Sequence, residues 1–368
     1  MKVYDDIKAV VYSHEEMESP IALRIISVAK KNSKILLTFN DEEELGEIIQ
    51  ELKKKYLSKE VLILKKFKGR KFQKCPGSPN VICCNYYLLN TCFNCLYDCT
   101  YCFLNSYLNS YGIIQFTNLD ELVPAIEEFT AKSDKIVRVG TGEFTDSLMF
   151  DNITGISKNL IDNTCHIKNL FLEFKTKSAN VDHILDIKNK GNTVLAWSLN
   201  TKKNILDYEH GASSLEERFE AALKAQKSGY YIAFHFDPII KYDNYLEDYL
   251  NVIDSIFEKF DPNKLVWISL GCFRHSMGFK DIIKHKYPFE KLTHEEMFPG
   301  IDGKYRYLKQ ERIKVFTAMK ERIERYSHKP FVYMCMEGEE IWRKVFNVNY
   351  RDSEDLENAF SEHLKKNF

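Results

Sequence analysis

The sequence predicts an α/β protein built on a partial (β/α)6 TIM-like barrel, with a small N-terminal α/β unit and a C-terminal extension. From residue 81 onward, apolar runs of strand length alternate with amphipathic helical segments. Six such units imply a parallel sheet, and the small and branched residues in the strands favour a sheet that curls. A closed barrel needs eight units, so this barrel is expected to be incomplete.

The chain is divided into an N-terminal unit with a basic arm (1–74), the barrel with its cysteine-rich loop (75–270) and an extension that closes the substrate side (271–368). In the first part, a helix is expected over residues 21–30, because Ser19 can cap it and Pro20 suits its first turn. A second helix follows Asn40, with acidic residues in its first turn and lysines in its last. A strand is expected at 61–64.

The barrel elements follow from their apolar patterns. The expected strands are 81–89, 136–139, 170–174, 193–198, 231–236 and 265–270, and the expected helices are 123–131, 181–188, 215–227 and 245–260. Ser213 and Glu216 can form a capping box for the helix at 215–227, and Gly229 can end it. The extension is expected to hold an amphipathic helix, a strand with a capping helix, and a final polar helix or frayed tail.

Seven of the ten cysteines lie between residues 74 and 106, and three of them form a C-x3-C-x2-C triplet. Cys95, Cys99 and Cys102 could hold a [4Fe-4S] cluster, with one of its four irons left open for another molecule. The alternative is a zinc knuckle with Cys92 as the fourth ligand. A second metal centre at Cys75, Cys83, Cys84 and Cys92 is a further possibility.

Overall charge gives no sign of nucleic-acid or membrane binding, because 52 basic residues balance 53 acidic ones to a net charge of −1. The N-terminal residues mix acids among apolar side chains, so neither a signal peptide nor a transmembrane helix is predicted. A cytoplasmic protein without membrane contact is expected. In that reducing compartment, clustered cysteines serve as ligands more readily than as disulfides.

The cysteine triplet, with Tyr101 just before its last cysteine, resembles the radical S-adenosylmethionine enzymes. More narrowly, several ordered blocks are similar to the spore photoproduct lyase family: CPGSPNVICCNY upstream, Thr176-Lys177, SLNT at 198–201, SSLEERFEAA at 213–222 and HFDPII at 235–240. The similarity extends over roughly residues 65 to 345.

The resemblance implies that the open iron binds S-adenosylmethionine and that the reduced cluster cleaves it to a 5′-deoxyadenosyl radical. It also implies the cofactor contacts. Tyr101 flanks the adenine, and Gly140, Gly142 and Glu143 form the glycine-rich segment near the amino group. Lys177 pairs with the carboxylate of the cofactor, and Ser198 and Asn200 form hydrogen bonds with the cofactor. A reductant such as flavodoxin or ferredoxin is implied as a partner.

Two departures from the family affect the chemistry that follows radical formation. Spore photoproduct lyases have a hydrogen-donor cysteine shortly after the second strand and a tyrosine after the last cluster cysteine. Here the segment is GEFTDSLMFD, without cysteine, and the residue after Cys102 is Phe103. Cys272 and Cys335 lie at predicted strand ends and could take the place of the missing hydrogen donor. Cys272 and Tyr101 are the predicted catalytic residues. The usual interpretation of a free cysteine is a small buried apolar residue.

Two groups of residues could contact DNA. The segment from Lys65 to Lys74 carries six basic residues interleaved with Phe67 and Phe72, and Tyr305 and Tyr307 lie among further basic residues. Solvated basic surface is the simpler interpretation of both.

Three functions are therefore weighed. The first is a radical carbon–carbon lyase that repairs a DNA pyrimidine photolesion. The second is the same radical chemistry on a different, non-DNA substrate, and the third is a non-catalytic, metal-containing nucleic-acid-binding protein.

Overall fold

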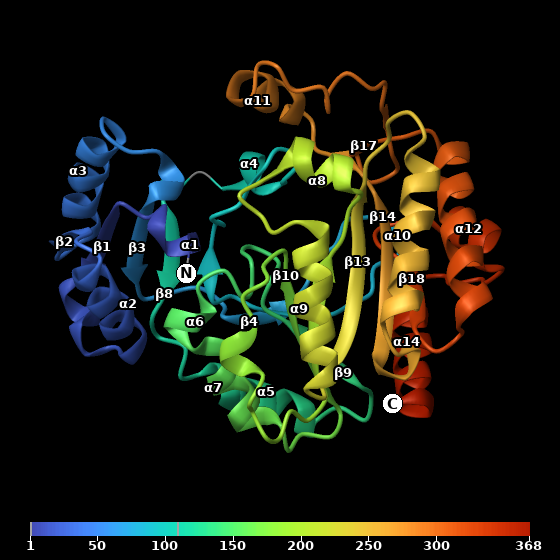
Figure 1. Ribbon diagram of the computed structural model, residues 1–368, viewed down its shortest axis with the longest axis horizontal. Helices are drawn as coiled ribbons and strands as arrows, with labels where there is room; N and C mark the ends of the chain where they lie inside the picture. The colour runs from blue at the N-terminus through green and yellow to red at the C-terminus, as the bar shows by residue number, and fades with distance from the viewer. Residues whose placement is uncertain (1, 109) are drawn as a thin grey trace.

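The computed structural model describes residues 2–108 and 110–368 and has an eight-stranded sheet at its centre (Figure 1). The strand order is β18–β14–β13–β11–β10–β9–β5–β4, and every neighbouring pair is parallel except β4 with β5. The strands are β4 (Phe72–Lys74), β5 (Tyr87–Leu89), β9 (Val137–Gly140), β10 (Leu170–Thr176), β11 (Thr193–Ser198), β13 (Tyr231–Ile239), β14 (Leu265–Cys272) and β18 (Phe331–Met334).

Two polar contacts inside the sheet require it to curl. Trp267 Nε1 on β14 donates a hydrogen bond to the Glu173 carboxylate on β10 at 3.0 Å, and His235 Nε2 on β13 lies 2.7 Å from the same oxygen. Two strands separate β10 from β14, so their side chains meet across the concave face. Since β18 and β4 end the strand order, the barrel stays open. The predicted partial barrel is confirmed.

Helices connect the strands and cover the convex face. They are α5 (Leu122–Ala131), α6 (Asp151–Thr154), α7 (Ile156–Thr164), α8 (Lys202–Tyr208), α9 (Leu215–Lys227) and α10 (Tyr245–Lys259). The capping box of α9 lies one residue later than predicted, at Ser214 and Glu217. The reason is that the Ser213 hydroxyl accepts a hydrogen bond from the Ala179 amide instead.

The helix predicted at 181–188 is wrong. This segment contains only a 3-10 turn, Asp182–Ile184. Val181, Ile184 and Ile187 recur every three residues and are all buried, so a tighter turn satisfies the same apolar pattern. The strand predicted at 81–89 is also shorter and begins at Tyr87.

The N-terminal unit has a five-stranded sheet of its own, in the order β2–β1–β3–β8–β6. Its strands are β1 (Ala9–Ser13), β2 (Ile35–Phe39), β3 (Val61–Lys65), β6 (Cys92–Phe93) and β8 (Ile113–Phe116), and its main helices are α2 (Pro20–Lys31) and α3 (Glu42–Lys53). Ser19 caps α2 as predicted. β6 and β8 lie after residue 74 in the chain but belong to the N-terminal sheet, whereas β4 lies before that division and belongs to the barrel sheet. The predicted division at residue 74 therefore does not separate the two sheets. The cysteine triplet lies between β6 and β8 and is therefore held at both ends by the N-terminal sheet.

The C-terminal extension contributes β18, α11 (Phe279–Lys286), α12 (Lys309–Tyr326), α13 (Glu339–Phe346) and α14 (Ser353–Asn367). α14 is not a frayed tail, because Leu356, Phe360 and Leu364 are buried in the main core. The Phe360 ring packs 4.3 Å from that of Phe331 on β18 and 3.7 Å from the Arg138 guanidinium on β9. None of the helices described is long and apolar enough to cross a membrane.

The packing of α14 predicts a large loss of stability when its central ring is removed. Phe360→Ala should lower the free energy of unfolding by about 3–5 kcal/mol, because a buried aromatic ring leaves a cavity. Glu362→Ala on the exposed side of the same helix is the matched control and should stay within about 0.5 kcal/mol of wild type. Urea denaturation followed by circular dichroism measures both; equal effects would contradict the packing role.

Candidate active site

The cysteine loop is fastened to the barrel by a short antiparallel ladder. β7 (Asp98–Cys99) pairs with β12 (Glu209–His210), and the Thr100 amide donates to the Tyr208 carbonyl at 2.9 Å. Asp98 also forms ion pairs with Lys59 at 3.0 Å and Lys286 at 2.9 Å. The loop therefore has fixed contacts to the N-terminal unit, to the barrel and to α11.

The three predicted ligands share one environment. Burial raises the pKa of the Cys95, Cys99 and Cys102 thiols, that of Cys99 to about 12, and the positive charge of Lys59 opposes the shift at all three. Each ligand of an iron–sulfur cluster binds its own iron, so the thiols need not converge on one point. No group of three or more His, Cys, Asp or Glu side chains in residues 2–108 and 110–368 is arranged to hold a single metal ion. Three cysteine thiols on one loop near Lys59 fit the three protein ligands of such a cluster.

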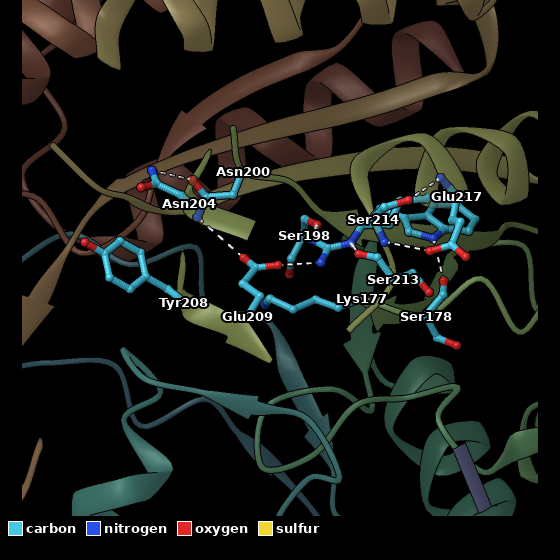
Figure 2. A network of polar contacts seen from close by, with 12 residues as sticks. Lys177, Ser178, Ser198, Asn200, Asn204, Tyr208, Glu209, Ser213, Ser214 and Glu217 are labelled. Carbon is cyan, nitrogen blue, oxygen red and sulfur yellow. Dashed lines mark hydrogen bonds and ion pairs between the residues drawn. The ribbon is translucent and has the colours of Figure 1, made fainter. Parts of the chain in front are cut away.

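A fully buried ion pair lies next to the loop, because β12, which carries one of its partners, pairs with β7. Figure 2 shows that partner, Glu209, among polar side chains such as Ser198. Arg218 on α9 and Glu209 on β12 form this pair, with 0 % and 1 % side-chain exposure. Arg218 also donates to the Ser198 carbonyl and the Ser213 carbonyl, each at 2.9 Å. The Tyr101 hydroxyl donates to the other oxygen of Glu209. Although burial opposes ionisation, the charge of Arg218 lowers the pKa of Glu209.

Three of the predicted cofactor residues surround this pair. The Lys177 ammonium lies 5.7 Å from the centre of the Tyr101 ring, and its charge also opposes the raised thiol pKa values of Cys99 and Cys102. Ser198 ends β11 beside the same group. Lys177 and Ser198 are thus brought together with the cysteine loop.

Asn200 lies in the same region but its amide is used within the protein. Its Oδ1 accepts hydrogen bonds from Tyr249 and Asn204, and its Nδ2 donates to the Pro238 carbonyl at 3.2 Å. The residue is 1 % exposed. These contacts favour a positioning role for Asn200 over direct cofactor contact.

The glycine-rich segment follows β9. A Cβ atom at Gly142 would lie 2.8 Å from the Lys175 carbonyl, so packing against β10 excludes a side chain there. A Cβ atom at Gly140 would lie 3.3 Å from the Tyr86 ring. Glu143 accepts a hydrogen bond from the Tyr86 hydroxyl and lies 3.5 Å from Lys175 Nζ. Gly140 and Gly142 are thus explained by packing, and Glu143 already has two partners within the chain.

A second polar group lies on the concave face at the ends of β10, β13 and β14. Asp237 forms a bidentate ion pair with Arg274 at 3.0 and 3.2 Å, and Arg274 contacts Cys335 Sγ at 3.4 Å. Although burial opposes its charge, the carboxylates of Glu143, Glu173 and Asp237 raise the pKa of Lys175. This group offers both signs of charge to a bound substrate.

Cys272 does not join the other predicted site residues. Trp267 and Ser269 on β14 contact Glu173 and His235 across the concave face. Since side chains alternate along a strand, Cys272 lies on the opposite face, where it is 3 % exposed. The structure therefore gives no support to a catalytic role for Cys272.

Four thiols outside the triplet form another group, which differs from the one expected. Burial raises the pKa of Cys75 and of Cys335, and the neighbouring Cys83 and Cys84 add to both shifts. Cys92 is absent from this group, because it lies on β6 beside the Thr145 side chain. A second metal centre with Cys92 as a ligand is not supported.

The aromatic residues expected to stack on bases are already packed. The Phe67 ring stacks on Phe116 at 4.4 Å, and Phe72 stacks on Tyr87 at 5.4 Å. Lys65, Lys66 and Lys71 form ion pairs with Glu42, Glu15 and Glu121. Base stacking by this segment, the arm from Lys65 to Lys74, is therefore wrong, although Lys68, Arg70 and Lys74 remain exposed.

Tyr305 and Tyr307, the second group predicted to contact DNA, are also already packed within the protein. Tyr307 is buried, and its hydroxyl accepts a hydrogen bond from the Lys241 amide. Tyr305 stacks on the His275 ring at 5.3 Å. Arg306 pairs with Asp302 and Glu337. These contacts hold together a small sheet of β15 (Arg274–His275), β16 (Phe298–Pro299) and β17 (Tyr305–Arg306).

Replacing Arg218 tests the importance of the buried pair. Arg218→Met should lower the free energy of unfolding by about 3–5 kcal/mol, because Glu209 is left as an unpaired buried carboxylate. The double variant Arg218→Met/Glu209→Gln should recover part of that loss. Lys224→Met, which removes an exposed ion pair on the same helix, is the control and should cost less than about 1 kcal/mol. Urea denaturation of all three checks this; an equal loss in the control would contradict it.

Comparison with known proteins agrees with this geometry. The spore photoproduct lyase of Bacillus subtilis (strain 168) is 32% identical over 222 residues, or 55% of this chain and 62% of the relative. That of Geobacillus sp. (strain Y412MC61) is 27% identical over 57% of this chain and 64% of the relative. The alignments thus span less than two thirds of the curated relatives' length.

Solved structures share the fold. A spore photoproduct lyase complexed with dinucleoside spore photoproduct has a TM-score of 0.77 at 22% identity, covering 89% of this chain and 98% of that one. A mutant with bound AdoMet and the same dinucleoside has a TM-score of 0.76. The family model for spore photoproduct lyase matches residues 9–336. Since that match covers most of the sequence, the chain belongs to the spore photoproduct lyase family.

Proposed function

We propose that this chain is a radical S-adenosylmethionine lyase that acts on a DNA pyrimidine photolesion. The observation that carries the proposal is the placement of Cys95, Cys99 and Cys102 on one fixed loop beside Lys177, at the carboxyl ends of the barrel strands. Family membership supports the same assignment. A related structure contains bound AdoMet and dinucleoside spore photoproduct, which supports the same cofactor and the same substrate class for this chain.

In this proposal, the three cysteines hold a [4Fe-4S] cluster. When bound, the reduced cluster and S-adenosylmethionine supply a 5′-deoxyadenosyl radical. Lys177 pairs with the carboxylate of the cofactor, Ser198 offers a hydroxyl for a hydrogen bond, and Tyr101 packs beside the adenine. Gly140 and Gly142 keep the segment after β9 packed closely against Tyr86 and Lys175. The chain's contribution is to orient the reactants and to exclude water.

The concave face places charged side chains where the substrate would lie. Lys175, Arg274, Asp237 and Glu143 can position polar groups of a nucleobase or sugar by hydrogen bonds. The same charges favour the second candidate, in which the radical chemistry acts on a non-DNA substrate with charged groups. A one-electron reductant such as flavodoxin or ferredoxin would supply the electron in either case.

The cluster assignment predicts a selective loss of iron. Anaerobically reconstituted wild-type protein should bind about four irons per chain and form 5′-deoxyadenosine when reduced. Cys99→Ala should lose both properties, whereas Cys92→Ala should retain them because Cys92 lies outside the shared environment. Iron and sulfide analysis with chromatography of the nucleoside measures the outcome. Equal loss in Cys92→Ala would favour a different ligand set.

The substrate assignment has its own test. Reduced, reconstituted protein incubated with irradiated DNA that contains spore photoproduct should consume the lesion and yield thymine, as mass spectrometry can measure. Unirradiated DNA is the control. Formation of 5′-deoxyadenosine with the lesion intact would reject this substrate and favour the second candidate. Absence of both would reject the radical lyase itself.

A further inference from the structure

Lys59 reaches the cysteine loop from outside the barrel. It lies in a 3-10 turn, Ser58–Glu60, directly before β3 of the N-terminal sheet. Its ammonium group donates a hydrogen bond to the Tyr97 carbonyl and pairs with Asp98 at 3.0 Å. Both of these partners lie between the first two cysteines of the triplet. The ammonium group is therefore held against the segment that joins two of the predicted cluster ligands.

The turn that carries Lys59 is itself fixed. The Leu57 amide donates a hydrogen bond to the Glu60 carboxylate at 2.7 Å, which closes the turn. The Ser58 hydroxyl accepts a hydrogen bond from the Gly112 amide at 2.9 Å. Gly112 lies after the cysteine triplet and directly before β8. One turn thus holds both the centre of the cysteine loop and its C-terminal end, which gives Lys59 a defined place.

Three lysines lie near the predicted ligands, and Lys59 is the most suitable of them to act on a cluster. In the proposed function, Lys177 pairs with the carboxylate of the cofactor. Lys286 on α11 has 39% of its side chain exposed, so solvent and salt screen its charge. The Lys59 side chain is 23% exposed. Its charge also opposes the burial-induced rise of the pKa of all three ligand thiols, as described above.

Lys59 keeps its positive charge in this environment. Although burial opposes that charge, the neighbouring Cys95 and Asp98 raise the pKa of Lys59. Asp98 also pairs with Lys286 at 2.9 Å. Two lysines therefore share one carboxylate, and two positive charges with one negative charge leave the group net positive.

We propose that Lys59 is a positioning residue that sets the reduction potential of the iron–sulfur cluster. This inference rests on the proposed function, in which the three cysteines hold a [4Fe-4S] cluster that is reduced before it cleaves S-adenosylmethionine. One electron passes from a one-electron reductant to the cluster and adds one negative charge there. A cation held close by, where little solvent screens it, stabilises that added charge. Lys59 therefore makes the cluster easier to reduce.

The first test compares reduction potentials of reconstituted protein without S-adenosylmethionine, so that no turnover takes place. Lys59→Met should lower the midpoint potential by about 59 mV, which is a ten-fold loss in the equilibrium of a one-electron couple. Lys59→Arg retains the charge and should keep the wild-type potential. Lys66→Met, which removes an exposed ion pair with Glu15 in the same unit, is the matched control and should also be unchanged. Electron paramagnetic resonance of samples poised at known potentials measures all four proteins.

Asp98→Asn tests the sign of the effect. Loss of this carboxylate, with Lys59 still bound to the Tyr97 carbonyl, should raise the midpoint potential because one nearby negative charge is removed. A fall like that expected for Lys59→Met would overturn the inference. An unchanged potential in Lys59→Met, or an equal fall in Lys66→Met, would overturn it too.

Iron content separates failure of this inference from failure of the proposed function. Wild-type protein that binds no iron on reconstitution would overturn the proposed function, and the inference with it. About four irons per chain with a potential that does not depend on residue 59 would overturn the inference alone. Lys59→Gln, which removes the charge but keeps a hydrogen-bond donor, replaces Lys59→Met where that variant loses iron. Loss of iron in Lys59→Arg as well would show that side-chain shape matters and charge does not, against the inference.

A second measurement needs neither cluster nor turnover. In the apoprotein, hydrogen exchange of peptides that span residues 94–102 should be several-fold faster in Lys59→Met than in wild type, because the ammonium group no longer holds the loop. Lys66→Met should exchange at the wild-type rate. Equal exchange in the two variants would show that Lys59 does not position the loop and would overturn the inference.

Discussion

The buried ion pair between Arg218 and Glu209 is the interaction on which the geometry of the site depends. Two fully buried charges are stable only when they are paired and their remaining hydrogen-bonding groups are satisfied, and here both conditions are met. Glu209 also pairs through its backbone with Cys99 and through its carboxylate with Tyr101. One residue thus contacts both the strand that carries a predicted cluster ligand and the aromatic ring beside it, and α9 supplies the guanidinium that pairs with this residue.

A second constraint acts on the loop from the opposite side. β6 and β8 flank the cysteine triplet and both join the N-terminal sheet, β6 as its edge strand. Lys59, just before β3 of that sheet, reaches Asp98 between two of the cysteines. The N-terminal unit is therefore part of the site's support. The N-terminal sheet needs β6 and β8, and these two strands also hold the ends of the cysteine loop. Folding of the sheet and placement of the loop are therefore coupled.

Local features of the fold could be predicted from sequence, whereas long-range pairings could not. The bounds of α9 followed from its apolar face, its cap region and Gly229, all within fifteen or so residues of one another. The joining of β8 to β3 depends on strands far apart in the chain, and no local pattern reports it. Cys272 was misplaced for a related reason. Both faces of a parallel barrel strand are apolar, so the sequence of β14 hides which side chains face inward. The pairing of Glu209 with Arg218 is likewise a tertiary contact that no local pattern predicts.

The segment after β9 is held by contacts to the residue that precedes β5. Glu143 occupies the segment where the family has its donor thiol, and its carboxylate holds the Tyr86 hydroxyl. That contact fixes the ring which lies beside Gly140, and the Tyr86 backbone in turn fixes Cys75. β4 runs antiparallel to β5, which is parallel to β9, so Cys75 after the end of β4 lies level with Tyr86 and not with Gly140 at the carboxyl end of β9.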